Sequence, residues 1–240
     1  MQGLTAADVL GVWERGQNRP PAERALALLA AAYPHTSPGD LACMSIGERD
    51  RLLLDLREAI FGPGFAARTA CPACGEELEL AFLAGDVRIE AAPPADGRLS
   101  LIRDGYTVEF RLPTAGDLLA VFDAQDPEAS LLHRCVVRSC LAGEPVAVSH
   151  LPPGIVDAVG EEMREADPQA DITLVLTCCS CTYEWQAAFD IVSYLWAEVA
   201  SLARRTLHEV HILASAYGWS ETEILAMSAW RRERYLELVD

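Results

Sequence analysis

Two pairs of cysteines with the same spacing limit what this chain can fold into more than any other feature. Cys71 and Cys74 stand in "ACPACGEELEL", and Cys178 and Cys181 stand in "LTCCSCTYEW". A tight turn with this spacing presents two sulfur atoms, and two such turns supply the four thiolates that a structural zinc ion binds in a tetrahedron. The sequence therefore predicts one structural zinc site formed by Cys71, Cys74, Cys178 and Cys181.

The loop between the two pairs is long, so the metal must offset the cost of closing it. Closing a loop of about a hundred residues costs roughly 4 kcal/mol more than closing a very short one. Zinc binding to four thiolates contributes on the order of 10 to 16 kcal/mol. Zinc can therefore hold two distant turns together. A closed site of this kind stabilises a fold rather than catalysing a reaction, because it leaves no position for water or substrate.

Two other interpretations of these cysteines remain open. They could be reduced cysteines in turns, or a redox pair, although a redox pair normally occurs once, at the start of a helix that follows a strand. Cys179 could replace Cys178 as a ligand, but the step from 178 to 181 matches the first pair. Gly75 suits a turn that needs positive φ, and Thr182 at the equivalent position suits it less well.

The remaining cysteines, Cys43, Cys135 and Cys140, lie in apolar segments that we interpret as helical, so they are expected to be small buried side chains rather than ligands.

The first residues lack the basic start and apolar run of a secretory signal. No apolar stretch approaches the roughly 18 residues of a membrane span. The predicted compartment is the cytoplasm, where thiols stay reduced and paired cysteines favour metal binding over disulfides.

The pattern of apolar residues predicts an α+β fold that is mainly helical. Alternating residues predict a hairpin around each cysteine pair, which together form a zinc ribbon, and a further hairpin around Asp104 and Gly105. The predicted order is N-terminal helices (1–66), first zinc knuckle hairpin (67–92), inserted β-hairpin and helices (93–168), second knuckle hairpin (169–189) and C-terminal helices (190–240).

Helical periodicity and capping residues indicate where the helices lie. The stretch "SPGD", which begins at Ser37, is predicted to break the chain, and "AAPPADG", residues 91–97, is predicted to be a linker. The predicted helices cover residues 5–16, 20–33, the segment between the Ser45 cap and Gly62, 114–123, 127–141, 153–166, 191–216, 220–227 and 229–239.

The charge of the chain excludes some classes of function. Nineteen basic and 36 acidic side chains give a net charge of -17, which repels phosphate backbones and anionic membrane surfaces. An acidic surface is more typical of a protein that binds a basic protein partner. We therefore expect neither a nucleic-acid-binding nor a membrane-binding protein.

No motif for catalysis stands out. "LHEVH" places His208 and His211 one helical turn apart with Glu209 beside His208, but the spacing differs from that of the HExxH zinc proteases. Ser149 and His150 form no nucleophile elbow, and the chain contains no phosphate-binding glycine motif. The sequence therefore predicts that the protein is not an enzyme.

The last part of the chain is rich in aromatic and arginine residues. Ser220 and Glu223 form a predicted capping box, and Ser228 caps a last helix that carries the run "RRER". Trp219, Trp230 and Tyr235 are either core aromatics or part of a surface that docks a partner, where aromatic and arginine side chains are favoured.

Several segments together resemble the T-even-type phage baseplate hub assembly chaperone-like family, which accompanies contractile phage tails and phage-tail-like injection systems. The resemblance covers nearly the whole chain. Cys179 stands where the second knuckle of the family usually carries proline. The segments are "VWERG", "ERALALLAAA", "IGERDRLLLDLREAIFG", "CPACGEELEL", "FRLPTAGDLLA", "LLHRCV", "EWQAAFDIVSYLWAEV" and "EVHILASAYGWSETEILAMSAWRRERYLELV".

The resemblance implies a cytoplasmic, non-enzymatic protein that is needed to build a baseplate or tail and that binds other tail or baseplate proteins. It leaves open whether the protein leaves after assembly or stays in the particle as a zinc-ribbon subunit. The sequence leaves the oligomeric state open. Two rival functions are a zinc-ribbon nucleic-acid regulator, which the charge disfavours, and a thiol oxidoreductase, which needs a thiol with a lowered pKa.

Overall fold

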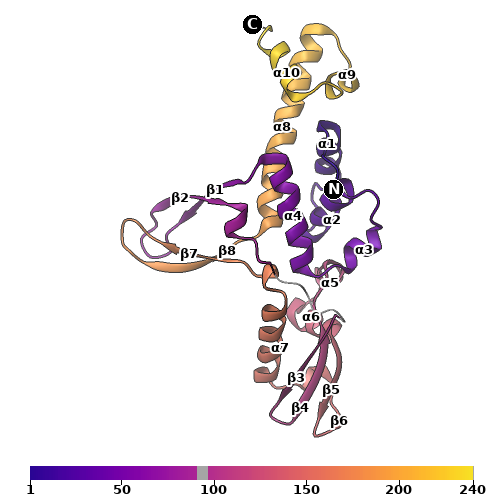
Figure 1. Cartoon of the computed structure of the whole chain (residues 1–240), viewed down its shortest axis with the longest axis vertical. Coiled ribbons are helices and arrows are strands. Elements are labelled where there is room, and N and C mark those ends of the chain that lie inside the picture. The colour runs from indigo at the N-terminus through magenta and orange to yellow at the C-terminus, as the bar shows by residue number, and fades with distance from the viewer. Residues whose placement is uncertain (91–96, 240) are drawn as a thin grey trace.

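A computed structural model of the chain describes residues 1–90 and 97–239, which extend along one long axis (Figure 1). A helical body lies in the middle, the C-terminal helices lie at one end, and an inserted sheet with its helices lies at the other. The boundary predicted between residues 92 and 93, and the predicted linker apart from Gly97, lie outside the described residues. The five-part division of the chain therefore stays a prediction.

The helical body is built from both ends of the chain. Its main helices are α1 (Ala6–Arg15), α2 (Pro21–Ala32), α4 (Ile46–Phe61) and the first half of α8 (Ile191–Tyr217). They bury one apolar core, whose fully enclosed side chains include Leu28, Leu53, Leu56 and Leu195. Each helix presents one apolar face to this core, as an amphipathic helix must in order to be stable in water.

The chain does not break at "SPGD" but forms the short helix α3 (Pro38–Cys43). The side chain of Ser37 accepts a hydrogen bond from the amide of Asp40, and Pro38 occupies the first turn, where no amide donor is needed. The same residues that signal a turn therefore also start a helix. Cys43, at the end of α3, is exposed, so the expectation of a buried side chain was wrong there.

Two hairpins project sideways from the body (Figure 1). The first pairs β1 (Gly64–Ala70) with β2 (Glu77–Leu83), and the second pairs β7 (Thr173–Thr177) with β8 (Glu184–Ala188). Each is an antiparallel two-stranded sheet with one half-buried face. A short 3-10 turn, η1 (Ala84–Asp86), follows β2, and the turn η3 (Pro168–Ala170) precedes β7.

The inserted segment forms a four-stranded sheet in the order β3-β4-β5-β6, packed against α7 (Pro153–Ala166). Val108 and Phe110 of the sheet and Ile155 of the helix are fully buried in its small core. Asp104 and Gly105 form the predicted hairpin turn, both with positive φ. The other elements are β3 (Arg98–Arg103), β4 (Tyr106–Arg111), α5 (Ala115–Val121), α6 (Pro127–Cys135), β5 (Val136–Leu141), β6 (Glu144–Pro145) and η2 (Val148–His150).

The helix predicted over 127–141 was wrong in its second half, because the chain becomes strand β5 at Val136. Val136 and Val137 are β-branched, and β5 pairs with β4 along its length. Pairing with a partner distant in sequence thus overrides the helical pattern. Cys140 is buried as expected, but it lies on a strand, whereas Cys135 is buried at the end of α6.

The inserted segment is held against the body by a buried hydrogen bond and a β-bridge. The carboxylate of Asp167 accepts a hydrogen bond of 2.8 Å from the amide of Gly47, in the first turn of α4. A Cβ at Gly47 would lie 1.9 Å from that carboxylate, so the contact requires glycine. In addition, Ser45 and Thr114 form an isolated antiparallel β-bridge.

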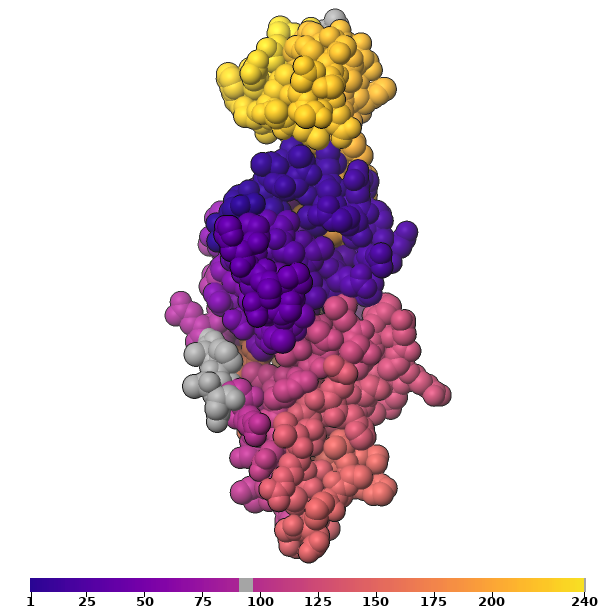
Figure 2. All heavy atoms as spheres, turned by 90° about the vertical axis from the view of Figure 1, so that its right-hand side faces the viewer, coloured from indigo at the N-terminus to yellow at the C-terminus, as the bar shows by residue number. Residues whose placement is uncertain are grey.

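The C-terminal helices form a knob at the end of the molecule, reached by the second half of α8 (Figure 2). Gly218 ends α8 in the left-handed conformation, a common helix terminator. The predicted capping box of Ser220 and Glu223 then starts α9 (Glu221–Leu225), and Ser228 caps α10 (Ala229–Leu236).

No helix in residues 1–90 and 97–239 combines the length and the apolar composition that crossing a membrane requires.

These elements confirm the predicted fold class. The fold is mixed α+β and mainly helical, its antiparallel sheets are small, and two hairpin regions bring four cysteines together.

Candidate metal centre

The first cysteine pair lies in the turn that joins β1 to β2. Pairing of Ala70 with Glu77 closes the strands just before the turn. The amide of Cys71 donates to the carbonyl of Glu76 at 2.8 Å, and the amide of Gly75 donates to the carbonyl of Cys71 at 2.8 Å. Gly75 has φ of 77°, which glycine adopts without strain.

The second pair lies in an equivalent turn between β7 and β8. The amide of Cys178 donates to the carbonyl of Tyr183 at 2.9 Å, and the amide of Thr182 donates to the carbonyl of Cys178 at 3.0 Å. Thr182 has φ of 59°, a conformation that costs a residue with a Cβ. The backbone therefore requires positive φ at this position, as expected, even though the residue is not glycine.

The two turns bring the four sulfur atoms together. Sγ of Cys71 lies 3.7 Å from Sγ of Cys181, and Sγ of Cys74 lies 3.6 Å from Sγ of Cys178. All four Sγ atoms lie within 4.8 Å of one another. A zinc–sulfur bond of about 2.3 Å implies a separation of about 3.8 Å between sulfurs of a regular tetrahedron. The cluster is therefore of the right size to hold a metal ion.

The surroundings of the cluster are apolar on one side. Cys71 and Cys178 are buried with Leu78, while Leu80 and Trp185 pack around them. Cys74 and Cys181 are exposed. The cluster thus lies at the tip of the two hairpins, with two sulfurs turned inward and two turned outward.

The thiols have unequal acidity. Backbone amides of Cys181 and Ser180 that donate to its sulfur lower the pKa of the Cys178 thiol to about 7. The amide of Glu76 lowers the pKa of Cys74, but hydrogen bonds with the neighbouring thiols outweigh this effect and raise it to about 12. Four thiolates at these distances would repel one another, so a cation bound between them would supply the charge that favours the ionised sulfurs.

Other residues considered as ligands or catalysts stay apart from the cluster. Cys179 is exposed in the second turn and is outside the four-sulfur group. Glu209 accepts a hydrogen bond of 2.9 Å from Arg232 and is therefore committed to holding α10 against α8. All four of the other candidates are exposed: Ser149, His150, His208 and His211. Within the described ranges no second group of three potential metal ligands is gathered.

A buried arginine fixes the first hairpin to the body. Arg57 of α4 binds both carboxylate oxygens of Glu198 on α8, at 2.8 and 2.9 Å, and donates to the carbonyl of Gly62. Its guanidinium lies 3.9 Å from the centre of the Phe65 ring, on β1. Sequence reasoning missed this contact, because 141 positions separate the arginine from the glutamate.

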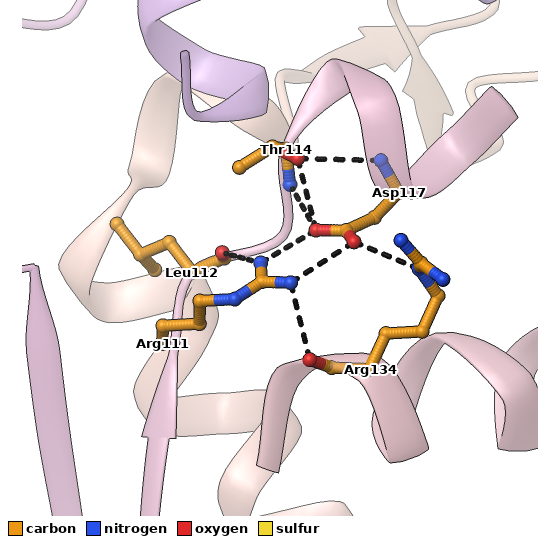
Figure 3. A network of polar contacts seen from close by, with 5 residues as sticks. All are labelled: Arg111, Leu112, Thr114, Asp117 and Arg134. Carbon is orange, nitrogen blue, oxygen red and sulfur yellow. Dashed lines mark hydrogen bonds and ion pairs between the residues drawn. The ribbon is translucent and has the colours of Figure 1, made fainter. Parts of the chain in front are cut away.

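A second polar network holds the start of α5 (Figure 3). Asp117 accepts hydrogen bonds from Arg111 at 2.5 and 3.0 Å and from Arg134 at 2.8 Å, and it forms a capping box with Thr114. Burial opposes ionisation, but Arg111, Thr114 and Arg134 hold the pKa of Asp117 well below its usual value. The sequence analysis did not identify this network; the spacing of Thr114 and Asp117 is a local signal for the capping box, whereas no local signal indicates the two arginine partners.

Comparison with known protein families identifies a match over most of the chain. The model of a family described as T4 bacteriophage base plate protein matches residues 17–196, a range that contains both cysteine pairs. No curated protein and no solved structure matches the chain. The resemblance seen in the sequence is thereby confirmed at the level of base plate proteins.

Proposed function

The chain belongs to the T4 bacteriophage base plate protein family, and from this premise we propose that it is a non-enzymatic assembly factor, or chaperone, for the baseplate or tail of a contractile phage-like particle. The single observation that supports this role is the family match over residues 17–196. The narrower likeness to hub assembly chaperones rests on the sequence segments quoted above. Its partners in this proposal are other tail or baseplate proteins.

The four clustered cysteines are proposed to hold one structural zinc ion. Their chemistry supports this, since four sulfurs in a tetrahedron suit zinc or an iron–sulfur centre, and a closed set of four thiolates is typical of structural zinc. When bound, zinc would supply the charge that holds the four sulfurs together. Cys71 and Cys74 would position the β1–β2 turn, and Cys178 and Cys181 the β7–β8 turn.

The proposed function is binding rather than catalysis. The metal site has no position for a substrate, and the polar networks of Arg57 and Asp117 consist of ion pairs between side chains that already satisfy one another. Such networks stabilise the arrangement of elements. The protein would therefore act through its surface, by holding other proteins during assembly.

Deletion of the gene tests the proposal. The expected result is that sheathed particles are absent or misassembled in electron micrographs, and that the intact gene supplied in trans restores them. Normal particles in normal numbers without the protein would contradict the role. Mass spectrometry of purified particles then separates two forms of the role: an assembly factor is absent from the finished particle, and a retained zinc-ribbon subunit is present at fixed stoichiometry.

A further inference from the structure

A groove runs between the two hairpins, where β2 and β7 face each other without pairing. The two strands belong to separate two-stranded sheets, so each has one edge without a neighbouring strand. The groove has a volume of about 370 Å³ and is lined by consecutive residues, 79–82 of β2 and 174–176 of β7. Side chains alternate between the two faces of a strand, so a surface lined by consecutive residues follows the edges of the strands.

The hydrogen bonds of the first hairpin show which backbone groups β2 turns toward its free edge. Cys71 and Glu76 form a hydrogen-bonded pair, and such pairs alternate along an antiparallel ladder. Ala66 and Ala81 are therefore a non-hydrogen-bonded pair, whose N–H and C=O groups point outward. Consistent with this, the outward groups of Ala66 bind the hydroxyl of Tyr194 at 3.0 and 2.8 Å. Ala81 and Glu79 thus direct their backbone groups away from β1.

Strand β7 follows the same alternation along its ladder with β8. The amide of Phe189 donates to the carbonyl of Ile172, and the amide of Cys178 donates to the carbonyl of Tyr183, so both of these are hydrogen-bonded pairs. Val175, which pairs with Gln186, lies at the alternate position and directs its N–H and C=O away from β8. Val175 is 72% exposed and lines the groove.

Outward backbone groups are satisfied where the first hairpin meets the body but not in the groove. Tyr194 caps Ala66, and the carboxylate of Asp86 accepts from the amide of Leu83 at 2.8 Å. Among the hydrogen bonds of residues 1–90 and 97–239, none engages the outward amides of Glu79, Ala81 or Val175. Free strand edges of this kind are templates for pairing with another strand.

Charge indicates what kind of strand fits. The two hairpins, residues 64–83 and 173–188, contain four glutamates and one arginine, Arg68, which is paired with Glu79. A second copy of the hairpins would be repelled by this charge, whereas a basic segment would be attracted. Leu80, Leu174 and Leu176 are half-buried and line the groove, so alternate apolar side chains of a bound strand have surface to contact.

We propose that this groove docks an extended segment of a partner protein, which adds as a strand between β2 and β7 and carries alternating apolar side chains flanked by arginine or lysine. Main-chain hydrogen bonds would provide affinity, and the leucines and glutamates would provide specificity. The inference rests on the proposed function only in taking the partner to be a tail or baseplate protein. Docking of the strand is a property of the groove and is tested separately.

The test uses the full zinc-loaded chain and a fluorescent peptide of alternating valine and threonine with two arginines at each end. Val175→Pro removes the outward amide of β7, and Gln186→Pro removes the outward amide of β8, on the side away from the groove. Proline is tolerated at a free strand edge, so both variants should keep the thermal midpoint and metal content of the wild type. Fluorescence anisotropy should show at least tenfold weaker binding to Val175→Pro and unchanged binding to Gln186→Pro.

Modified peptides sharpen the result. A strand held on both edges uses the amide of every central residue, so N-methylation of any one of them should abolish binding. A version flanked by glutamates should bind more weakly than the arginine version. Three results would overturn the proposal: equal loss of binding in both proline variants, unchanged binding in Val175→Pro, or no binding of the peptide to the wild type. So would a dimer of the chain alone that Val175→Pro disrupts, because the occupant would then be a second copy. None of these outcomes bears on the deletion experiment.

Discussion

Cys179 and Cys74 are both exposed thiols of the hairpin tips, but only Cys74 belongs to the four-sulfur cluster. With the proposed zinc ion in this cluster, Cys74→Ser should reduce bound zinc from about one ion per chain to nearly none. It should also destabilise the protein broadly, since the proposed metal would close a loop of about a hundred residues. Cys179→Ser is the matched control and should keep both metal and stability. Metal analysis by mass spectrometry and thermal unfolding measure the two effects. A stable, zinc-loaded Cys74→Ser would contradict the assignment.

Thr182 carries the backbone strain of the second turn. Its φ of 59° is one that glycine adopts readily, whereas other residues lose roughly 1 to 2 kcal/mol there. Thr182→Gly should relieve this strain, but the greater entropy of glycine in the unfolded chain offsets part of the gain. The free energy of unfolding should therefore rise by about 0.5 to 1 kcal/mol. Urea unfolding with zinc held constant checks this. Gly75→Thr, the reverse change in the first turn, should lower stability, and an increase would argue against strain as the cause.

At the scale of an element, Asp117 holds α5 against α6 and the end of β4 (Figure 3). Asp117→Asn removes the charge that two arginines share, and should destabilise the protein by about 2 kcal/mol at neutral pH. Both arginines are partly exposed, which limits the cost of leaving them unpaired.

The pH dependence of this effect has a definite sign. The native pKa of Asp117 is lowered, so its contribution is fully present above the unfolded pKa of about 4 and is lost as the pH falls toward the native pKa. Unfolding free energies of wild type and Asp117→Asn should therefore differ at pH 7 and converge in acid. A difference that stays constant between these pH values would show that the charge of Asp117 is not responsible.

Elements set by local contacts were predictable from the sequence. The helix starts at Ser45, Ser220 and Ser228 need only a side chain and an amide three positions away, and each forms the expected cap. The cysteine turns are local in the same way. Strand β5 was not predictable, because Val136 becomes part of a strand only by pairing with β4.

Contacts between distant parts of the chain could not be predicted from the sequence either. The ion pair of Arg57 with Glu198 and the capping of Ala66 by Tyr194 join residues on different elements, and no local pattern links their positions. The gathering of the two cysteine pairs was an exception, since the chemistry of a four-sulfur site demands that distant pairs meet.

At the scale of the whole molecule, the elongated shape separates the hairpins from the C-terminal knob (Figures 1 and 2). The groove between the hairpins lies at the side of the body, and the knob of α9 and α10 lies at one end. Trp230 on α10 is 68% exposed, whereas Ile224 of α9 is fully buried. Within the knob, the ring of Tyr217 stacks on that of Trp219, and the ring of Tyr235 packs edge-on against both. These three aromatics therefore pack the knob together, and Trp230 is more exposed than Tyr217, which is 36% exposed.

The most direct measurement of the central claim is affinity purification of the native protein from cells that are assembling particles, followed by mass spectrometry of the proteins bound to it. We predict that other tail or baseplate proteins of the same particle copurify at fixed stoichiometry, with zinc bound to the chain. A chain that copurifies with no tail protein, or with nucleic acid instead, would contradict it.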